Sequence, residues 1–584
     1  MDPLPALLQL PDELLDCVIS QIATPDDTHR FGLTCTRAHE LVCASPVWRR
    51  HCLETWKYWA PRHDVSAKLA QPPLHTDWRQ LFVERVRTDR MASRTFEALL
   101  LTQQGRAQRM QEIAAEGLDV QDLLLKIKDE TPDDAEDVLA RRWHAEAILG
   151  MVYRARAVDI WRRLRSGEEV SLEEAISGYD LFVLATDRTG VMEKVKARLS
   201  RIAQGIRDTT TNFDERSTRQ KAMLIADYLG LGVLVGNPDI ENYHALRNNF
   251  VGVALFDAPH SALPLQTVAI YCAVASRLGV DAKASNVPGH VIALVKSPPG
   301  QSLDGDPDAA DDGPGRIMFV DPWRSGHVIS PEELHHMLSE GGFPPQPPVE
   351  YFTGADPIEM VLRTSRNMLR SVEGARMENP HNLDIEAAQY SALWSMFVLG
   401  DPNLALAPTR RRHCLRFLVE QFQIYYPEDT ALFVEHALPL LEGQDEQRLV
   451  SQVVESMQED DRGEKTRRPR SDADAGVRYR IGQYFQHKRY GYRGFIVGWD
   501  SYCAAGDGWI ERMGVDDMPG GRRQPFYRIF GDDRSNRYVA QENIELLDGR
   551  PPQALLRLGG RFFKRWDDGE ERFLSNIRDE YPDD

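Results

Sequence analysis

The sequence predicts a multidomain α+β protein, with an N-terminal three-helix module, a helical scaffold carrying an α+β segment, and a small C-terminal β-barrel. Three observations lead to this fold class. Apolar residues recur at helical spacing through most of residues 10–234 and again over residues 357–441. Glycine, proline and β-branched residues become more frequent between residues 237 and 352. Residues 477–547 alternate polar and apolar side chains between glycine turns, which is typical of strands.

Length and composition limit the classes of function. The chain has 584 residues, 42% of them hydrophobic, which is enough for about three to five packed domains. Its net charge of -19 argues against a protein that coats nucleic acid or an anionic membrane. Seven cysteines without a CxxC pair predict reduced thiols, so we expect an intracellular protein of the cytoplasm or nucleus. Because no run of about eighteen apolar residues and no signal-peptide pattern is present, we expect no membrane partner. No pattern predicts a cofactor or a metal.

The first fifty residues carry three helix starts. Pro11 suits the first turn of a helix, Thr24 precedes Pro25 as a cap, and Ser45–Pro46 offers a third start. In the first helix the apolar residues recur at helical spacing: Leu14, Leu15, Val18, Ile19 and Ile22. Such a module is too small to bury a large core alone, so an apolar edge is expected to meet a partner. The alternative is an ordinary N-terminal helical bundle.

The order of motifs in this module resembles an F-box. The resemblance covers roughly residues 8–52, in a domain placed at 8–56, and is carried by Leu10-Pro11-x-x-Leu14, Leu33-Thr34-Cys35, Leu41 and Val47-Trp48. It implies that the apolar edge docks on a Skp-type adaptor, which in turn joins a cullin scaffold that carries the ubiquitin-transfer machinery. The residues expected to bind the adaptor are Leu10, Pro11, Leu14, Leu15, Ile19, Leu33, Val47 and Trp48.

Composition divides the rest of the chain into six segments. In order these are a helical scaffold at 78–236, an α+β domain at 237–352, a helical region at 357–458, a charged linker at 459–476, a strand-rich module at 477–547 and a polar tail at 548–584. The region 357–458 contains apolar stripes that suit either paired helices of the tetratricopeptide kind or a plain helical bundle.

The α+β segment contains the frame of a catalytic triad. An apolar helix at 265–278 precedes strands, and His290 and Asp321 lie at the ends of two adjacent predicted strands. This order resembles the transglutaminase-like superfamily, and more narrowly its SirB-type domain. The narrower resemblance is carried by Arg247-Asn248-Asn249-Phe250-Val251, Leu263-Pro264-Leu265, Arg277-Leu278-Gly279, Pro288-Gly289-His290 and Asp321-Pro322.

The nucleophile that this frame requires is missing from its expected position. A cysteine at the N-terminus of the helix would be stabilised as a thiolate, but the chain has Gln266 or Thr267 there. Cys272 lies on another face of the helix and is expected to be a small core residue. Gln266, His290 and Asp321 therefore predict a degenerate triad, without catalysis, that serves as a binding platform. The alternative is an enzyme of the transglutaminase-like or cysteine-protease-like kind.

The C-terminal module carries a second family signature. Its motifs resemble the hemimethylated-DNA-binding, heat-shock-protein-Q-like family, in Gly482, His487-Lys488, Tyr490-Gly491-Tyr492 and Pro525-Phe526-Tyr527. Residues expected to bind a ligand are His487, Lys488, Tyr490, Tyr492, Trp499 and Tyr527. Residues 476–550 contain twelve Lys or Arg and ten Asp or Glu, so the segment lacks the strongly basic face of a phosphate reader. Protein recognition is therefore favoured, and DNA binding is the alternative.

Taken together, the three modules in this order resemble the F-box-only protein 21 family. The resemblance implies the substrate-recognition subunit of a Skp-cullin-F-box ubiquitin ligase, which promotes ubiquitination and degradation of bound proteins. Such a subunit raises the effective concentration of substrate near the ubiquitin carrier and contributes no nucleophile of its own. The expected partners are the Skp-type adaptor, the cullin scaffold and protein substrates.

Overall fold

The computed structural model describes residues 10–44, 46–184, 192–230, 236–307, 316–324, 326–340, 351, 353–378, 383–400, 407–471, 474 and 476–584. Residues 8, 9, 45 and 352, which border predicted segments or elements, lie outside these ranges. The chain divides into two units: Met1–Val152 with Ser456–Asp584, and Tyr153–Glu455. Among the described helices, none combines the length and apolar character that a membrane crossing requires.

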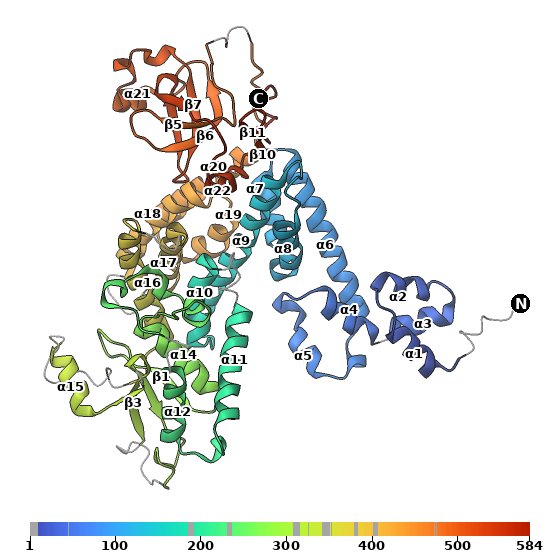
Figure 1. The fold of residues 1–584 in the computed structure, drawn as a ribbon, viewed down its shortest axis with the longest axis vertical. Coiled ribbons are helices and arrows are strands. Elements are labelled where there is room, and N and C mark those ends of the chain that lie inside the picture. The colour runs from blue at the N-terminus through green and yellow to red at the C-terminus, as the bar shows by residue number, and fades with distance from the viewer. Residues whose placement is uncertain are drawn as a thin grey trace, which may run out of the picture. The chain divides into compact units, whose positions relative to one another are not determined.

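The first unit begins with short helices followed by a long one (Figure 1). These helices are α1 (Asp12–Ser20), α2 (Pro25–Gly32), α3 (Thr36–Ala44), α4 (Val47–Thr55), α5 (Val65–Ala70), α6 (Trp78–Leu101), α7 (Arg106–Ala114) and α8 (Gln121–Glu130). Thr24 caps α2 by accepting a hydrogen bond from the N–H of Asp27 at 3.1 Å, as the sequence predicted.

Over its described residues, the N-terminal module has four helices where three were predicted. The additional helix is α3, whose polar sequence lacks the Pro or capping signal of the other three. It is held by tertiary contacts, since Ala38 and Val42 on α3 are buried and the indole N–H of Trp48 donates to the carbonyl of Val42 at 2.8 Å. The core of the module continues beyond residue 56 and includes Trp78 and Leu81 of α6.

The second unit is built of helices around one sheet. Its helices are α10 (Leu172–Val183), α11 (Met192–Thr209), α12 (Thr218–Gly230), α13 (Val251–Phe256), α14 (Pro264–Arg277), α15 (Pro331–Glu340), α16 (Pro357–Ala375), α17 (Ile385–Leu399), α18 (Ala407–Tyr425) and α19 (Thr430–Leu432). Two longer helices run from one unit into the other, α9 (Val138–Arg165) and α20 (Gln444–Arg462).

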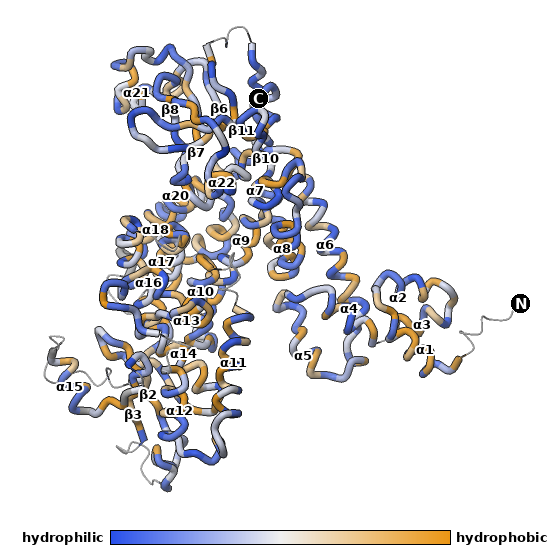
Figure 2. The backbone as a smooth tube through the Cα atoms, viewed as in Figure 1, coloured by the Kyte–Doolittle hydropathy of each residue, from blue (hydrophilic) through white to orange (hydrophobic). Residues whose placement is uncertain are grey.

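The sheet of the second unit is antiparallel and has the order β1-β2-β3-β4. Its strands are β1 (Asp281–Ala284), β2 (Ala293–Lys296), β3 (Ile317–Asp321) and β4 (His327–Ile329). Helices α12 and α14 pack beside these strands (Figure 1). The helix α14 is largely hydrophobic, as its colouring in Figure 2 shows, and its residues 264–275 are all buried. The predicted α+β segment is therefore present, although β2 begins at Ala293, three residues after His290.

The C-terminal domain of the first unit contains a five-stranded antiparallel sheet with the order β8-β7-β6-β5-β9. Its strands are β5 (Tyr484–His487), β6 (Arg493–Asp500), β7 (Phe526–Gly531), β8 (Asn536–Ala540) and β9 (Ile544–Leu546), and α21 (Asp507–Met513) interrupts the connection from β6 to β7. The prediction of a closed barrel is wrong, because among the described residues β8 and β9 remain the two edges of the sheet. The hydrogen-bond ladder leaves both strands with one neighbour each.

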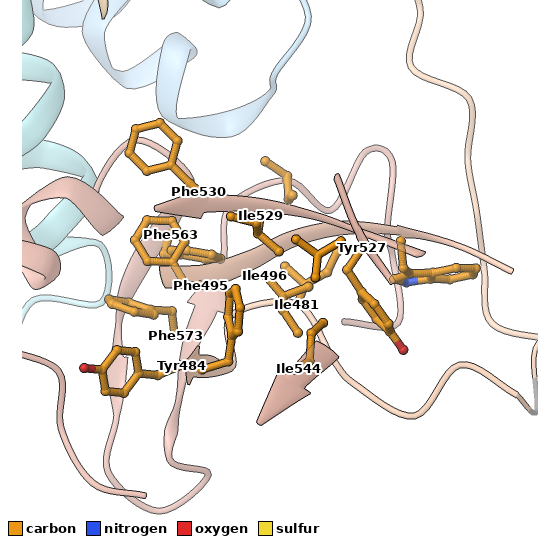
Figure 3. Packing of buried hydrophobic residues seen from close by; sticks show 14 of the residues in the cluster. Ile481, Tyr484, Phe495, Ile496, Tyr527, Ile529, Phe530, Ile544, Phe563 and Phe573 are labelled. Carbon is orange, nitrogen blue, oxygen red and sulfur yellow. The ribbon is translucent and has the colours of Figure 1, made fainter. Parts of the chain in front are cut away.

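Residues 548–584, expected to be a polar tail, are part of this domain instead. They form α22 (Gln553–Gly559), β10 (Phe563–Asp567) and β11 (Arg572–Ser575). Phe563 and Phe573 stack at 4.8 Å and pack with Phe495 of β6 in the hydrophobic core shown in Figure 3. Gly482 joins this segment to the sheet: its φ of 87° favours glycine, and a side chain there would overlap the carbonyl oxygen of Phe573.

The segment predicted as a charged linker is also ordered where it is described. Residues 459–462 are the last turn of α20. Arg470 forms an ion pair with Asp584 at 2.9 Å, and its backbone N–H donates to Asp583 at 2.8 Å. The charges of this stretch therefore bind the C-terminal domain and do not simply face solvent.

Candidate functional site

Four of the eight predicted adaptor-contact residues lie in the core of the N-terminal module. Leu15 and Ile19 of α1 are fully buried, and Val47 and Trp48 of α4 are 4% and 3% exposed. In this arrangement their role is to hold the helices together, because a partner cannot reach them without opening the module.

The other four lie nearer the surface. Leu14 is 50% and Leu33 is 67% exposed, Pro11 is exposed, and Leu10 is half-buried. The start of α1 is fixed by Arg37 of α3, which donates to the carbonyl of Leu10 at 2.7 Å and to the Asp12 carboxylate at 2.6 Å. Exposed leucines on a rigid helical module are suited to docking another protein.

The triad-like site of the second unit lies at the N-terminus of α14. Leu263 occupies the cap position and no side chain caps the helix, while Pro264 occupies the first turn. Gln266 is fully buried, and neither polar atom of its amide has a hydrogen-bond partner among the described residues. Cys272, further along α14, is also buried, and burial raises the pKa of its thiol.

His290 and Asp321 are hydrogen-bonded, as the sequence predicted for the ends of adjacent strands. The distance from Nε2 of His290 to Oδ2 of Asp321 is 2.7 Å. The Asp321 carboxylate is fully buried, and its Oδ1 accepts from the backbone N–H groups of Trp323 at 3.1 Å and Arg324 at 3.2 Å. Three donors on one carboxylate make it a strong local anchor for the turn that follows β3.

Trp323 connects this pair to α14. Its indole N–H donates to the carbonyl of Ala262, two residues before the helix, at 2.9 Å. Its ring meets the imidazole of His290 edge to face, with centroids 5.7 Å apart. The structure therefore places the His290–Asp321 pair near the start of α14, while no described hydrogen bond joins Gln266 to either residue. A histidine oriented by a buried carboxylate can activate a side-chain nucleophile only if one lies beside it.

The predicted ligand residues of the C-terminal domain separate into two groups. His487, Tyr490 and Tyr492 line a hollow of about 1220 Å³. Trp499 and Tyr527, by contrast, are 3% and 0% exposed in the domain core. Lys488 is exposed, and its ammonium donates to the carbonyl of Glu542 at 2.8 Å, which ties the turn after β5 to the loop before β9.

His487 is the most constrained residue of the hollow. Its Nδ1 accepts from the backbone N–H groups of Arg489 at 3.1 Å and Tyr490 at 3.2 Å, and its ring lies 4.8 Å from Tyr490 and 4.9 Å from Tyr492. Burial lowers the pKa of His487, and the nearby Arg537 and Arg489 lower it further. The imidazole is therefore neutral at pH 7, and the bonds to Nδ1 place its proton on Nε2.

Several lining residues were missed by the sequence reasoning. Trp509 and Met513 come from α21, and Arg537 and Tyr538 from β8. The spacing of Trp509 and Met513 at i and i+4 signals one helix face, but no helix was predicted between β6 and β7.

Family models match two parts of the chain. Residues 193–366 match the transglutaminase-like superfamily, and residues 477–570 match a family described as hemimethylated DNA-binding protein YccV like. Both domains are therefore present. The first match begins at α11, within the segment predicted as helical scaffold, and the second extends into the segment predicted as a tail.

Curated relatives supply the remaining comparison. A protein from Pongo abelii is 26% identical over 296 residues, and proteins from Mus musculus and Homo sapiens are each 26% identical over 302 residues. All three are named F-box only protein 21. The chain is similar to F-box only protein 21, as its motifs predicted. The matches cover 49% of this chain and 43% of each F-box only protein 21, so the chain is matched to less than half the length of these relatives. No solved structure matches.

Proposed function

We propose that this chain is the substrate-recognition subunit of a Skp-cullin-F-box ubiquitin ligase. In this proposal the N-terminal module binds the Skp-type adaptor, and the transglutaminase-like and C-terminal domains bind proteins that are to be ubiquitinated. The main support is the pair of exposed leucines, Leu14 and Leu33, on a module whose core contains Ile19, Val42, Val47 and Trp48. The similarity to F-box only protein 21 adds independent support.

Two observations weigh against a thiol enzyme at the α14 site. The residue at the third position of α14 is Gln266, whose amide is not a nucleophile at neutral pH. Cys272, on the same helix, is buried with a raised thiol pKa, whereas an attacking cysteine requires a lowered one. The proposal therefore assigns the His290–Asp321 pair to support of the domain.

Adaptor binding tests the proposal directly. We would co-purify the full chain with a Skp-type adaptor and compare it with a Leu14→Asp/Leu33→Asp double variant. Burying two leucines contributes about 3–6 kcal/mol, so placing charges there is expected to weaken the complex by at least about a hundredfold. Leu101→Asp is the matched control, because Leu101 is 83% exposed and lies outside the N-terminal module.

Each outcome has a definite meaning. A stoichiometric complex that survives Leu101→Asp and is lost in the double variant supports the proposal. A natural chain that forms no complex, or a double variant that binds as tightly as the natural chain, refutes it. Turnover of a glutamine-containing peptide that depends on His290 would favour the enzyme alternative instead.

A further inference from the structure

One edge of the C-terminal sheet is open. Strand β8 pairs with β7 on one side, and the N–H of Gly531 donates to Ser535 at 2.9 Å at one end of the ladder. At the other end the N–H of Gln541 donates to Pro525, also at 2.9 Å. Bonded and non-bonded pairs alternate along an antiparallel ladder. The backbone N–H groups of Asn536, Tyr538 and Ala540 therefore point away from β7, towards the open edge.

The outward groups of Asn536, which is exposed, and Tyr538, which is half-buried, are available for pairing, whereas Ala540 is only 2% exposed. Within the described part of the chain, no hydrogen bond engages the backbone N–H of Tyr538 or Ala540 on the side away from β7. Unpaired groups along a strand edge are a ready template for an additional strand. The β8 edge therefore lacks a neighbouring strand and also carries backbone N–H groups without a hydrogen-bond acceptor among the described residues.

A hollow runs along this edge. The four consecutive residues 536–539 line the hollow of about 1220 Å³, and residues 538–540 line a second hollow of about 440 Å³. Neighbouring residues of a strand point to opposite faces, so a cavity lined by four in succession follows the strand edge. Its other walls include the turn after β5 and α21, with Tyr490 62% exposed and Met513 50% exposed.

The charges of the hollow indicate what can occupy it. Its two arginines are already paired: Arg528 binds Glu580 at 2.9 Å, and Arg537 binds Asp533 while its guanidinium lies 3.9 Å from the centre of the Tyr492 ring. A phosphate backbone would have to compete with these carboxylates. Aromatic rings and a methionine side chain instead suit apolar side chains, and the Nε2 proton of His487 provides one neutral donor.

We infer that the hollow beside β8 binds an extended, largely apolar peptide segment of a partner protein, which adds as a sixth strand to the sheet. The backbone groups of Asn536 and Tyr538 would pair with the segment, and Tyr490 and Met513 would contact its alternate side chains. That the partner is a ubiquitination substrate rests on the proposed function, whereas the binding mode itself does not.

Selection from a peptide library provides the probe. The full chain would be used to select from displayed random 12-residue peptides, and the affinity of the enriched peptides would be measured by fluorescence anisotropy. Asn536→Pro removes one outward N–H at an exposed residue and leaves the β7 ladder intact, because that N–H does not point towards β7. We expect at least a tenfold loss of affinity. Tyr490→Ala, at an exposed side chain, is expected to lose a similar factor without affecting the fold.

The opposite edge offers a matched control. In β9 the N–H of Leu547 donates to Tyr484 at 3.0 Å, so Leu546 points its own N–H outwards. Leu546→Pro is expected to leave peptide affinity unchanged, and thermal unfolding would verify that each variant folds.

Three results would overturn the inference. They are a library that yields no specific peptide, wild-type affinity in both Asn536→Pro and Tyr490→Ala, and displacement of the peptide by hemimethylated duplex DNA in a salt-sensitive manner. The Leu14→Asp/Leu33→Asp variant separates this inference from the proposed function. It should bind the peptide normally, and a failure of adaptor binding alone would refute only the ligase role.

Discussion

Asp180 provides the sharpest test of the buried electrostatics in the second unit. It lies on α10, is fully buried, and accepts a hydrogen bond from the N–H of Gly252 in the first turn of α13 at 2.6 Å. Burial raises the pKa of Asp180 to about 8, against the opposing effect of the backbone N–H groups of Gly252 and Val251. Asp180→Asn keeps the shape and the acceptor oxygen while removing the titration.

The sign and size of the effect follow from proton linkage. The ordinary pKa of 3.8 applies to the unfolded chain, so the folded state holds this proton more tightly. The resulting stability is complete below the unfolded pKa and is lost as pH rises towards about 8. One bound proton corresponds to about 1.36 kcal/mol per pH unit, or about 2.7 kcal/mol between pH 5 and 7. The free energy of unfolding of Asp180→Asn does not fall in this way, because the asparagine amide does not titrate.

Native-state hydrogen exchange measures this difference locally. Peptides covering α10 and α13 would be compared between wild type and Asp180→Asn at each pH, so that intrinsic exchange rates cancel. The variant should gain protection relative to wild type by about a hundredfold between pH 5 and 7. Peptides from β6, in the other unit, serve as the internal control and should not change. A ratio that stays constant with pH, or wild-type protection that improves as pH rises, would refute the reasoning.

Three further predictions concern single side chains. Because Cys272 is buried with a raised thiol pKa, it should react with an aromatic disulfide reagent only after unfolding, and rapid labelling of the native chain would contradict this. Trp48→Ala should destabilise the N-terminal module by about 3–5 kcal/mol in urea unfolding, whereas Leu33→Ala should change it by less than about 0.5 kcal/mol. Asp321→Ala should lower the urea midpoint more than His290→Ala, because the carboxylate accepts three hydrogen bonds and the imidazole donates one; equal shifts would contradict this.

The sequence was most informative where the structure depends on local pattern. The apolar run of α14, the cap at Thr24 and the succession of β1, β2 and β3 are each encoded in a few neighbouring residues. The His290–Asp321 contact was also predictable from the sequence. His290 precedes β2, Asp321 is the last residue of β3, and these two strands are consecutive and antiparallel. In such a pair the start of the first strand lies beside the end of the second, so no long-range information is needed to place these two residues together.

Features that depend on distant residues were not predictable in the same way. The burial of Phe563 and Phe573 requires the core around Phe495, about seventy residues earlier in the chain. Local pattern could not show this contact, so the charge-rich segment 548–584 was predicted to be a tail. The open edge at β8 likewise depends on the order of all five strands. Trp499 and Tyr527 looked like ligand contacts because aromatic residues serve cores and binding sites equally well, and only the packing separates the two.

The same distinction bears on the transglutaminase-like domain. Asp321 ties together β3, the turn through Trp323 and the His290 loop, so a histidine–aspartate pair has a structural value that does not depend on any reaction. Gln266 has no such bonds among the described residues, and an unpaired buried amide costs about 1–3 kcal/mol. A thiol at this position would cost less to bury, since sulfur is a weak hydrogen-bonding group. Under the proposed function, Gln266 together with the His290–Asp321 pair would keep the frame of the domain without supplying a thiol that could attack, a combination that a binding subunit can tolerate and a thiol enzyme cannot.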